Sequence, residues 1–203
     1  CNHIEQANSE QLIVDYWTFG GGTAMMLQID HRESHDVDIF LSDAQLLGFL
    51  DPAKHDFHFE IMPADYQGDG ARFLKLAFKD IGEIDYIVGD ALTAKPTTEK
   101  IVESKAVLLE TIPEIITKKI YHRGESIKPR DIFDVAAAGV SHGDTIIEAL
   151  RMYPDKVAKA IAKIDSLKPD FVNGAIAALA IKEPFKAVAE TAIERTKEIL
   201  RAV

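Results

Sequence analysis

Two aspartates separated by one residue are the strongest candidates for chemistry in this sequence. Asp36 and Asp38 alternate with the apolar residues Val37 and Ile39, a pattern that indicates a β-strand. Residues two apart in a strand share a face, so both carboxylates are expected to point the same way, roughly 6.5 Å apart. Hard cations such as Mg²⁺ bind carboxylate oxygens. Taken alone, an Asp-x-Asp pair is more often a solvated strand edge.

A glycine-rich turn precedes the aspartates. Gly20-Gly21-Gly22-Thr23 follows the apolar run 16–19, which we read as a strand, and leads into 24–29, which we read as a short helix. Such a turn brings backbone N–H groups and the positive end of a helix to an anion, typically a phosphate. The hydroxyl of Thr23 could cap that helix or bind the phosphate. A glycine run alone is usually only a turn, but the combination with Asp-x-Asp is much less common.

This order of strand, glycine turn, short helix and Asp-x-Asp strand resembles the polymerase-β-like nucleotidyltransferase superfamily. More narrowly, Phe-Gly-Gly-Gly-Thr-Ala from Phe19, followed by His-Arg-x-Ser-x-Asp-Val-Asp-Ile-Phe from His31, is similar to the AbiEii/AbiGii family of bacterial toxin-type nucleotidyltransferases. The usual family form has Ser where this chain has Thr23, and both residues carry a hydroxyl.

A basic helix and the start of the next helix form a second signature. Lys119 and Arg123 are four residues apart and share a helical face. With the following Lys-Pro-Arg130-Asp131-x-x-Asp134, they resemble the second signature of the same family. Without the resemblance, this would be a solvated basic helix. Lys118 is a rival to Lys119, which we prefer because it directly precedes an apolar residue, as in the family pattern.

Asp85 is the candidate for a third carboxylate. Its neighbours Ile84, Tyr86, Ile87 and Val88 predict a largely buried strand, where an aspartate is costly unless it meets a cation or hydrogen-bond donors. The alternative is an ordinary carboxylate on an edge strand. Two-metal phosphoryl chemistry usually needs a third carboxylate that faces the first pair.

The resemblance implies a role for each of these residues in transfer from an NTP. Its implied metal ligands, for two Mg²⁺ ions, are Asp36, Asp38 and Asp85, and these three with Asp131 are the implied catalytic residues. Its implied nucleotide-binding residues are Gly21, Gly22, Thr23, Lys119, Arg123 and Arg130. Asp131 would orient a basic neighbour or move a proton, and Asp134 would be a packing partner of the basic residues. His31 and His35 make a poor zinc pair, since no Cys or third His lies nearby.

The surrounding pattern predicts an α+β fold, with an N-terminal nucleotidyltransferase mixed β-sheet with helices followed by a C-terminal helical bundle. We expect a nucleotidyltransferase core at residues 1–95 and a helical domain at 96–203 that completes the nucleotide cleft. The expected strands are 37–41, 57–61, 73–78 and 83–88, with a turn or mobile loop at 63–70. The expected helices are 43–50, 112–123, 130–140, 143–152, 154–165, 169–181 and 184–202, with helical character from residue 97 onwards.

Composition and charge are those of a soluble globular protein. Of 203 residues, 47% are hydrophobic and 28% charged, and no apolar run reaches the ~18 residues of a membrane span. The single cysteine, Cys1, fits a cytoplasmic protein. Residues 1–90 hold 5 Lys or Arg against 17 Asp or Glu, whereas residues 91–203 hold 18 against 16. Because the first residue is not Met, native N-terminal residues could be missing.

The leading hypothesis is a Mg²⁺-dependent transferase that moves a nucleotidyl group from an NTP to an acceptor, in a bacterial toxin–antitoxin or phage-defence setting. The family favours an RNA end, such as a tRNA acceptor stem, and a cognate antitoxin. Lys156, Lys159 and Lys163 share a helical face that could contact RNA or simply be solvated. The alternatives are an AMP-transferase acting on a partner protein and a non-catalytic nucleotide-binding interaction module.

Overall fold

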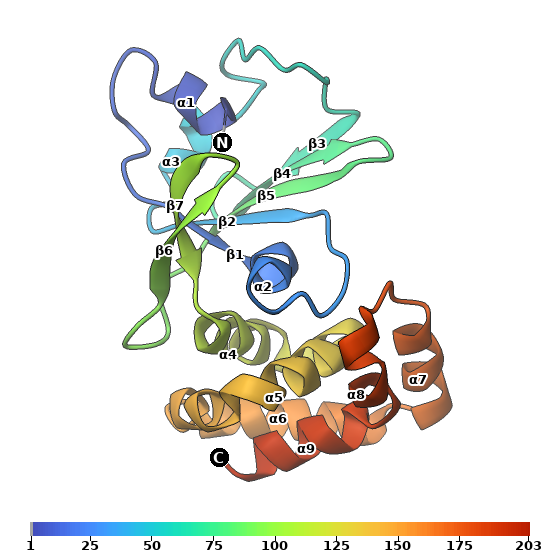
Figure 1. Ribbon diagram of the computed structural model, residues 1–203. Helices are drawn as coiled ribbons and strands as arrows, with labels where there is room; N and C mark the ends of the chain where they lie inside the picture. Colours follow the sequence, from blue (N-terminus) through green and yellow to red (C-terminus); the bar gives the residue numbers. More distant parts are fainter. Residues whose placement is uncertain (1) are drawn as a thin grey trace. The chain divides into compact units, whose positions relative to one another are not determined.

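The computed structural model describes residues 2–203, which form two compact units interleaved along the chain (Figure 1). The sheet unit contains residues 2–24, 35–91 and 97–110, and the helical unit contains residues 25–34, 92–96 and 111–203. Both units therefore draw on both sides of the boundary expected after residue 95. Whether they are the two expected domains stays a prediction.

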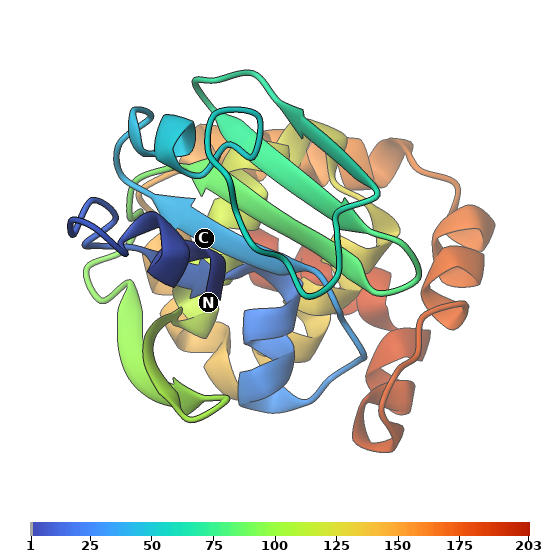
Figure 2. The same ribbon diagram turned by 90° about the horizontal axis from the view of Figure 1, so that it is seen from above.

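A mixed sheet of seven strands forms the sheet unit, in the order β3-β4-β5-β2-β1-β7-β6. Its strands are β1 Thr18–Gly20, β2 Val37–Leu41, β3 Asp65–Gly68, β4 Phe73–Phe78, β5 Gly82–Val88, β6 Thr97–Val102 and β7 Lys105–Glu110. Figure 2 shows β2, β5 and β4 side by side. The expected strands 37–41, 73–78 and 83–88 are confirmed, as is the α+β fold class.

The central strands have one apolar and one polar face. Cross-strand neighbours share a face, and Tyr86 of β5 lies between Ile39 of β2 and Leu74 of β4 in register. These three side chains are buried in the core of the sheet unit. The same core includes residues from α1 Asn2–Ala7 and α3 Leu46–Phe49. The residues that alternate with them therefore occupy the opposite face.

His3 of α1 is part of this packing. Its Nδ1 lies 2.8 Å from the hydroxyl of Tyr86, and its ring contacts Phe57 and Phe59. We expected a strand at 57–61, but these residues do not form one. The apolar alternation there arises because Phe57 and Phe59 pack on the imidazole of His3 and make no strand pairing. Burial lowers the pKa of His3 to about 4.

We expect His3 to make the fold sensitive to mild acid. The unfolded histidine takes up a proton near pH 6.5, whereas the folded one resists until about pH 4, so stability is lost as the pH falls through this window. The full loss is about 3 kcal/mol. Urea unfolding at pH 7.5 and pH 4.5 should show a smaller pH-dependent loss for His3→Phe than for the wild type. Groups that titrate in both proteins cancel in this comparison, and equal losses would contradict the prediction.

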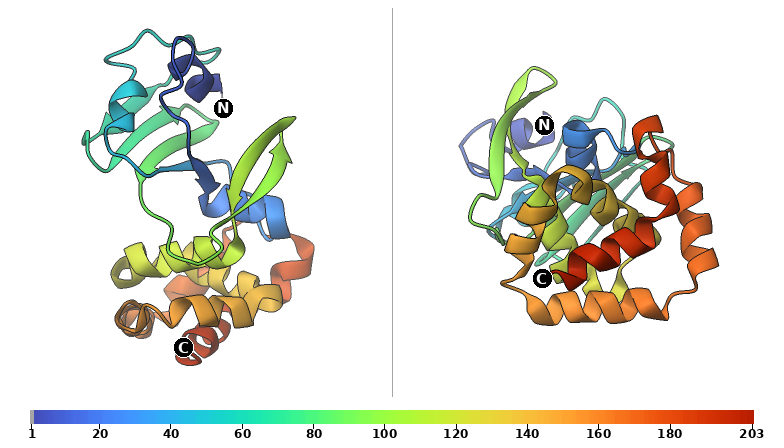
Figure 3. Two further views of the ribbon diagram at one scale, coloured as in Figure 1. Left: turned by 90° about the vertical axis from the view of Figure 1, so that its left-hand side faces the viewer. Right: turned by 60° about the horizontal axis from the view of Figure 1, so that its bottom comes forward.

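Residues 97–110 form a β-hairpin, whereas the sequence pattern predicted helical character from residue 97 onwards. β6 pairs antiparallel with β7 from Thr97↔Glu110 to Val102↔Lys105, and β7 pairs with β1 (Figure 3, left). The turn has no glycine or asparagine to reveal it in the sequence. Its two central residues, Glu103 and Ser104, have φ values of +50° and +64°. This left-handed conformation is unfavourable for most L-residues and is typical of a type I′ turn.

Relief of this turn should stabilise the protein. Glu103→Asn combined with Ser104→Gly places the residues that a type I′ turn prefers, and we expect a gain of about 1–2 kcal/mol in the free energy of unfolding. Denaturant unfolding measures it. Ser104→Ala is the matched control, because alanine keeps the strain. A gain in the control equal to that of the double variant would argue against backbone strain as the cause.

The expected loop at 63–70 is also wrong, because it contains β3. β3 pairs antiparallel with β4 at one edge of the sheet, from Asp65↔Ala77 to Gly68↔Leu74. All four of its residues are exposed. An edge strand without a buried face has no hydrophobic alternation, so the sequence pattern could not distinguish it from a loop.

Helices make up the helical unit (Figure 3, right). They are α4 Ile112–Arg123, α5 Pro129–Leu150, α6 Pro154–Ser166, α7 Pro169–Ala177, α8 Lys186–Glu190 and α9 Ala192–Arg201. The helices expected at 112–123 and 154–165 are confirmed. Those expected at 130–140 and 143–152 are one helix, α5, since Gly139 and Gly143 do not interrupt it. The expected helix 169–181 ends at Ala177, and the helix expected over 184–202 is divided into a short 3₁₀ turn, α8 and α9.

No helix among residues 2–203 is long and apolar enough to cross a membrane.

Candidate active site

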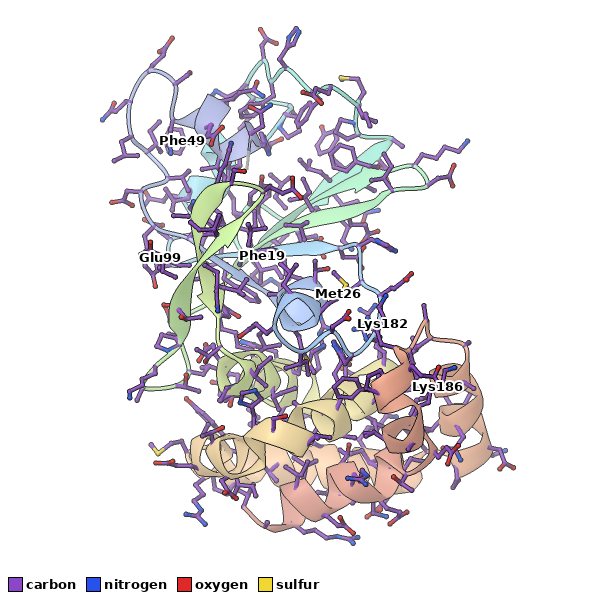
Figure 4. All side chains as sticks on the ribbon, in the orientation of Figure 1. Phe19, Met26, Phe49, Glu99, Lys182 and Lys186 are labelled. Atoms are coloured by element: carbon purple, nitrogen blue, oxygen red, sulfur yellow. The ribbon has the colours of Figure 1, made fainter. Side chains whose placement is uncertain are left out.

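The glycine turn lies at the end of β1. Phe19, labelled in Figure 4, is the buried residue before Gly20, and Gly20 pairs with Asp38 of β2. Gly21 has a φ of +70° and is the first residue of α2 Gly21–Ile29. The expected strand–turn–helix order is confirmed, and the helix begins earlier than expected. The first N–H groups of a helix have no partner within that helix, so the turn can present donors to an anion.

Two contacts explain why glycine is required here. A Cβ on Gly21 would lie 1.8 Å from Oδ2 of Asp38, and a Cβ on Gly20 would lie 2.3 Å from Oε2 of Glu110. The backbone of the turn therefore lies directly against the carboxylate of Asp38. This close approach places the candidate phosphate-binding turn and the candidate metal ligand in one small region of the sheet unit.

Thr23 has a role that the sequence did not indicate. Its hydroxyl donates a short hydrogen bond to the backbone carbonyl of Asp36. The side chain thus ties the first turn of α2 to the segment before β2. The phosphate-binding role of Thr23 stays a prediction, since it requires the hydroxyl to change partner.

Asp38 and Asp85 are direct neighbours. β2 and β5 pair in parallel, with Asp38 opposite Asp85, so both side chains lie on the polar face of the sheet. The strand expected to carry the third carboxylate is thus placed beside the Asp-x-Asp strand. The strand register thus places Asp85 beside Asp38, a proximity that the sequence could only predict.

The environment of Asp85 is unusual for an aspartate. Burial raises its pKa to about 6, an effect that Lys75 opposes and that Asp38 reinforces. Nζ of Lys75 lies 3.4 Å from Oδ2, whereas Oδ1 is buried and has no hydrogen-bond partner. A buried carboxylate oxygen without a donor is costly, and a cation would satisfy it.

Asp36 is placed differently from the other two aspartates. It lies one residue before β2, and its Oδ1 accepts a hydrogen bond of 3.2 Å from the backbone N–H of Glu83. Among residues 2–203, no group of three or more His, Cys, Asp or Glu side chains is arranged to hold a metal ion. The protein thus offers carboxylate oxygens without a complete cage. Mg²⁺ is commonly bound in this way, by one or two carboxylates together with substrate phosphates, so Asp38 and Asp85 fit such an ion.

In the helical unit, Lys119 is buried between two aspartates. Its Nζ lies 2.9 Å from Oδ1 of Asp131 and 3.0 Å from Oδ2 of Asp134. Burial alone would lower the pKa of Lys119, but Asp134 and Asp131 outweigh it and raise that pKa. Asp131 also accepts a hydrogen bond from the backbone N–H of Lys128, which caps the start of α5. Both carboxylate oxygens of Asp131 are thereby engaged, which fits an orienting role better than proton transfer.

Asp134 joins the two signature segments within the helical unit. Arg32 donates to both of its oxygens, at 2.8 Å from Nε and 3.0 Å from Nη2, and Nε2 of His31 lies 2.9 Å from Oδ1. Burial would raise the pKa of Asp134, but Lys119, His31 and Arg32 hold that pKa well below its usual range. Sequence reasoning missed this role of His31 and Arg32.

The remaining basic residues differ in exposure. Lys118 is as buried as Lys119, and its Nζ lies 3.6 Å from Oε1 of Glu114. The preference for Lys119 over Lys118 stays a prediction. Arg123 is partly exposed, with Nη1 3.6 Å from Oδ1 of Asp131, and Arg130 is exposed. Arg123 and Arg130 are thus the residues of this group whose side chains reach solvent.

A mixed sheet that sets carboxylates on neighbouring parallel strands beside a glycine turn agrees with the nucleotidyltransferase class that the sequence resembles. Comparison with protein families agrees with this class. Residues 5–199 match the family model described as "Nucleotidyl transferase AbiEii toxin, Type IV TA system". The chain therefore belongs to the AbiEii nucleotidyltransferase toxin family.

Solved structures show the same fold. A candidate nucleotidyltransferase from Helicobacter pylori is 18% identical, with a TM-score of 0.50, and the match covers 98% of this chain and 91% of that one. MenT4, a nucleotidyltransferase toxin from Mycobacterium tuberculosis, is 14% identical, with a TM-score of 0.52 and coverage of 100% and 82%. A search among curated proteins finds no match to the sequence.

Proposed function

We propose that the protein is a Mg²⁺-dependent enzyme that transfers a nucleotidyl group from an NTP to the end of an RNA. The observation that carries this proposal is the parallel register of Asp38 and Asp85 directly beside the backbone of Gly21. The candidate carboxylates and the candidate phosphate-binding turn are thereby close enough to act on one triphosphate. The family match supports nucleotidyl transfer in general.

Each residue then has a defined task. Gly21 and Gly22 would bind phosphate oxygens through backbone N–H groups, and Asp38 and Asp85 would hold the metal. Bound Mg²⁺ would offset phosphate charge and lower the pKa of the acceptor hydroxyl. Asp36 would complete the ligand set by releasing the N–H of Glu83.

The basic residues would act on the phosphates. Arg123 and Arg130 would neutralise charge that grows on the triphosphate during transfer. Lys119, whose ammonium pairs with Asp131 and Asp134, would donate its third N–H to a phosphate oxygen. Asp131 would keep that ammonium in place.

One experiment tests the reaction. The protein is incubated with Mg²⁺, each radiolabelled NTP in turn, total tRNA and total protein extract, and the products are separated on a gel. We expect label on RNA from one preferred NTP, and no label when EDTA replaces Mg²⁺. Label on a protein band alone would replace the RNA proposal by AMP transfer to a partner protein. No label in any lane would leave the non-catalytic module as the better explanation.

The RNA acceptor is proposed to lie on the lysine stripe of α6, which consists of Lys156, Lys159 and Lys163. Lys156 lies over the ring of Tyr121, with Nζ 4.6 Å from its centroid, and Lys159 pairs with Glu125. A stripe of cations beside an aromatic ring is a typical surface for an RNA backbone with an unpaired base.

Charge reversal on this stripe should separate acceptor binding from NTP binding. We expect Lys156→Glu/Lys159→Glu/Lys163→Glu to reduce RNA labelling at least about tenfold and to leave NTP binding unchanged, because phosphate contacts dominate RNA affinity. The matched control changes three lysines elsewhere, Lys79, Lys168 and Lys186, and gives the same change in net charge. Equal losses in both variants would show that overall charge, and not the stripe, is responsible.

We further propose that the enzyme acts in the cytoplasm, where NTPs and tRNA are present, and that a cognate antitoxin counteracts it in a toxin–antitoxin or phage-defence system. The type IV toxin–antitoxin description of the family supports the antitoxin. Expression in bacteria tests this: growth should stop when the protein is produced alone and recover when a cognate antitoxin is produced with it.

A further inference from the structure

Lys75 lies beside the candidate metal ligands, and sequence reasoning gave it no role. It is the register partner of Asp85 on β4, so a row of side chains runs from Lys75 through Asp85 to Asp38 across three adjacent strands. The ammonium of Lys75 is half-buried, 3.4 Å from Oδ2 of Asp85, and it also pairs closely with Glu83. The strand pairing fixes this position, unlike that of a lysine on a flexible loop.

The charges around Lys75 make its position significant. Asp38, Glu83 and Asp85 place three carboxylates on one face of two adjacent strands, and Asp36 is bonded to the N–H of Glu83. Like charges at such distances repel each other strongly where water is partly excluded. Lys75 offsets part of this repulsion. It also holds one oxygen of Asp85, which leaves the buried Oδ1 as the oxygen that has no donor.

We propose that Lys75 acts as a tethered cation that takes the place of a second metal charge, so that the site binds a divalent cation tightly only together with nucleotide phosphates. This inference rests on the proposed function and assigns a further positioning residue to the same site. The ammonium keeps the carboxylates assembled when no metal is bound. It also repels an incoming divalent cation until the phosphates add negative charge.

The side-chain arrangement accounts for both effects. Since Lys75 occupies Oδ2 of Asp85, a metal is offered Oδ1 of Asp85 and the carboxylate of Asp38, which is an incomplete ligand set. An incomplete set binds Mg²⁺ weakly unless phosphates supply the remaining oxygens. A positive charge held next to that set lowers its affinity further. Removal of the charge should therefore increase metal affinity without nucleotide.

Calorimetric titration of Mn²⁺ and Mg²⁺ into nucleotide-free protein at pH 8 tests this inference. We expect Lys75→Met to bind Mn²⁺ about tenfold more tightly than the wild type, and Lys75→Arg to bind as the wild type does. With a non-hydrolysable NTP analogue present, the difference between Lys75→Met and the wild type should shrink. Lys79→Met is the matched control, because Lys79 is an exposed lysine just after the same strand. This variant should bind Mn²⁺ with the affinity of the wild type.

The following results of the metal titration would overturn the inference. Equal or weaker Mn²⁺ binding by Lys75→Met would reduce Lys75 to a structural ion-pair partner. If Lys75→Met does not fold, the rise in melting temperature with Mn²⁺ is compared between Lys75→Gln and the wild type, and an equal rise has the same meaning. RNA labelling by a wild type that binds no Mn²⁺, even with the analogue, would overturn this inference and the metal assignment but retain nucleotidyl transfer. Failure of both labelling and Mn²⁺ binding would overturn the proposed function as well.

Discussion

Asp38→Asn is expected to reduce nucleotidyl transfer at least about 100-fold, because loss of groups that only orient metal ligands already costs 10- to 100-fold in many metalloenzymes. The fold should remain intact. Asp38 adjoins Asp85 in register, so removal of one negative charge relieves repulsion in the metal-free protein. The melting temperature without metal should therefore stay the same or rise.

Asp65→Asn on the exposed edge strand β3 is the matched control, since it removes one strand aspartate away from the site. It should retain full transfer activity. Mg²⁺ together with an NTP should raise the melting temperature of the control and the wild type, but not that of Asp38→Asn. Wild-type transfer by Asp38→Asn would remove Asp38 from the catalytic residues.

Asp134→Ala should destabilise the protein by about 3–5 kcal/mol, the range found when one partner of a buried ion pair is removed. The carboxylate of Asp134 is fully buried and bonded to Lys119, Arg32 and His31. Its loss leaves two buried cations with fewer acceptors. Urea unfolding measures the change, and Asp134→Asn should retain part of the stability by keeping one acceptor oxygen.

Asp165→Ala provides the comparison at the surface. Asp165 pairs with Lys197 at 2.7 Å in the same helical unit, but its side chain is about half exposed, so its removal should cost far less stability than removal of Asp134. A similar small cost for Asp134→Ala would mean that the network of Lys119, Asp134 and Arg32 does not stabilise the fold.

The sequence predicted the elements whose pattern reflects burial. β2, β4 and β5 have one buried face each, α4 is buried on nearly all sides, and the expected bounds of all four agree with the structure. β3 and the β6–β7 hairpin were missed for a physical reason: β3 has no buried face, and the Glu103–Ser104 turn has none of the residues that normally mark one.

The candidate site was predictable to a similar extent. Spacing alone could assign Gly21 to a glycine turn and Asp38 to an Asp-x-Asp strand, because each feature is local in the sequence. The partnership of Asp134 with His31 and Arg32 could not be predicted in this way, because about 100 residues separate them in the sequence and only tertiary packing brings them together. The contact between Lys75 and Asp85 could not be predicted either, because it depends on the register in which β4 and β5 pair.

The interleaving of the two units has a consequence for exchange of parts between relatives. A chimera joined once between residues 95 and 96 would separate Asp134 from its hydrogen-bond partners His31 and Arg32, and would combine the β6–β7 hairpin with a foreign sheet. Residues 25–34, 92–96 and 111–203 would have to be transplanted together. Recombination in this family should therefore succeed with five matched junctions, whereas a single crossover yields an insoluble hybrid.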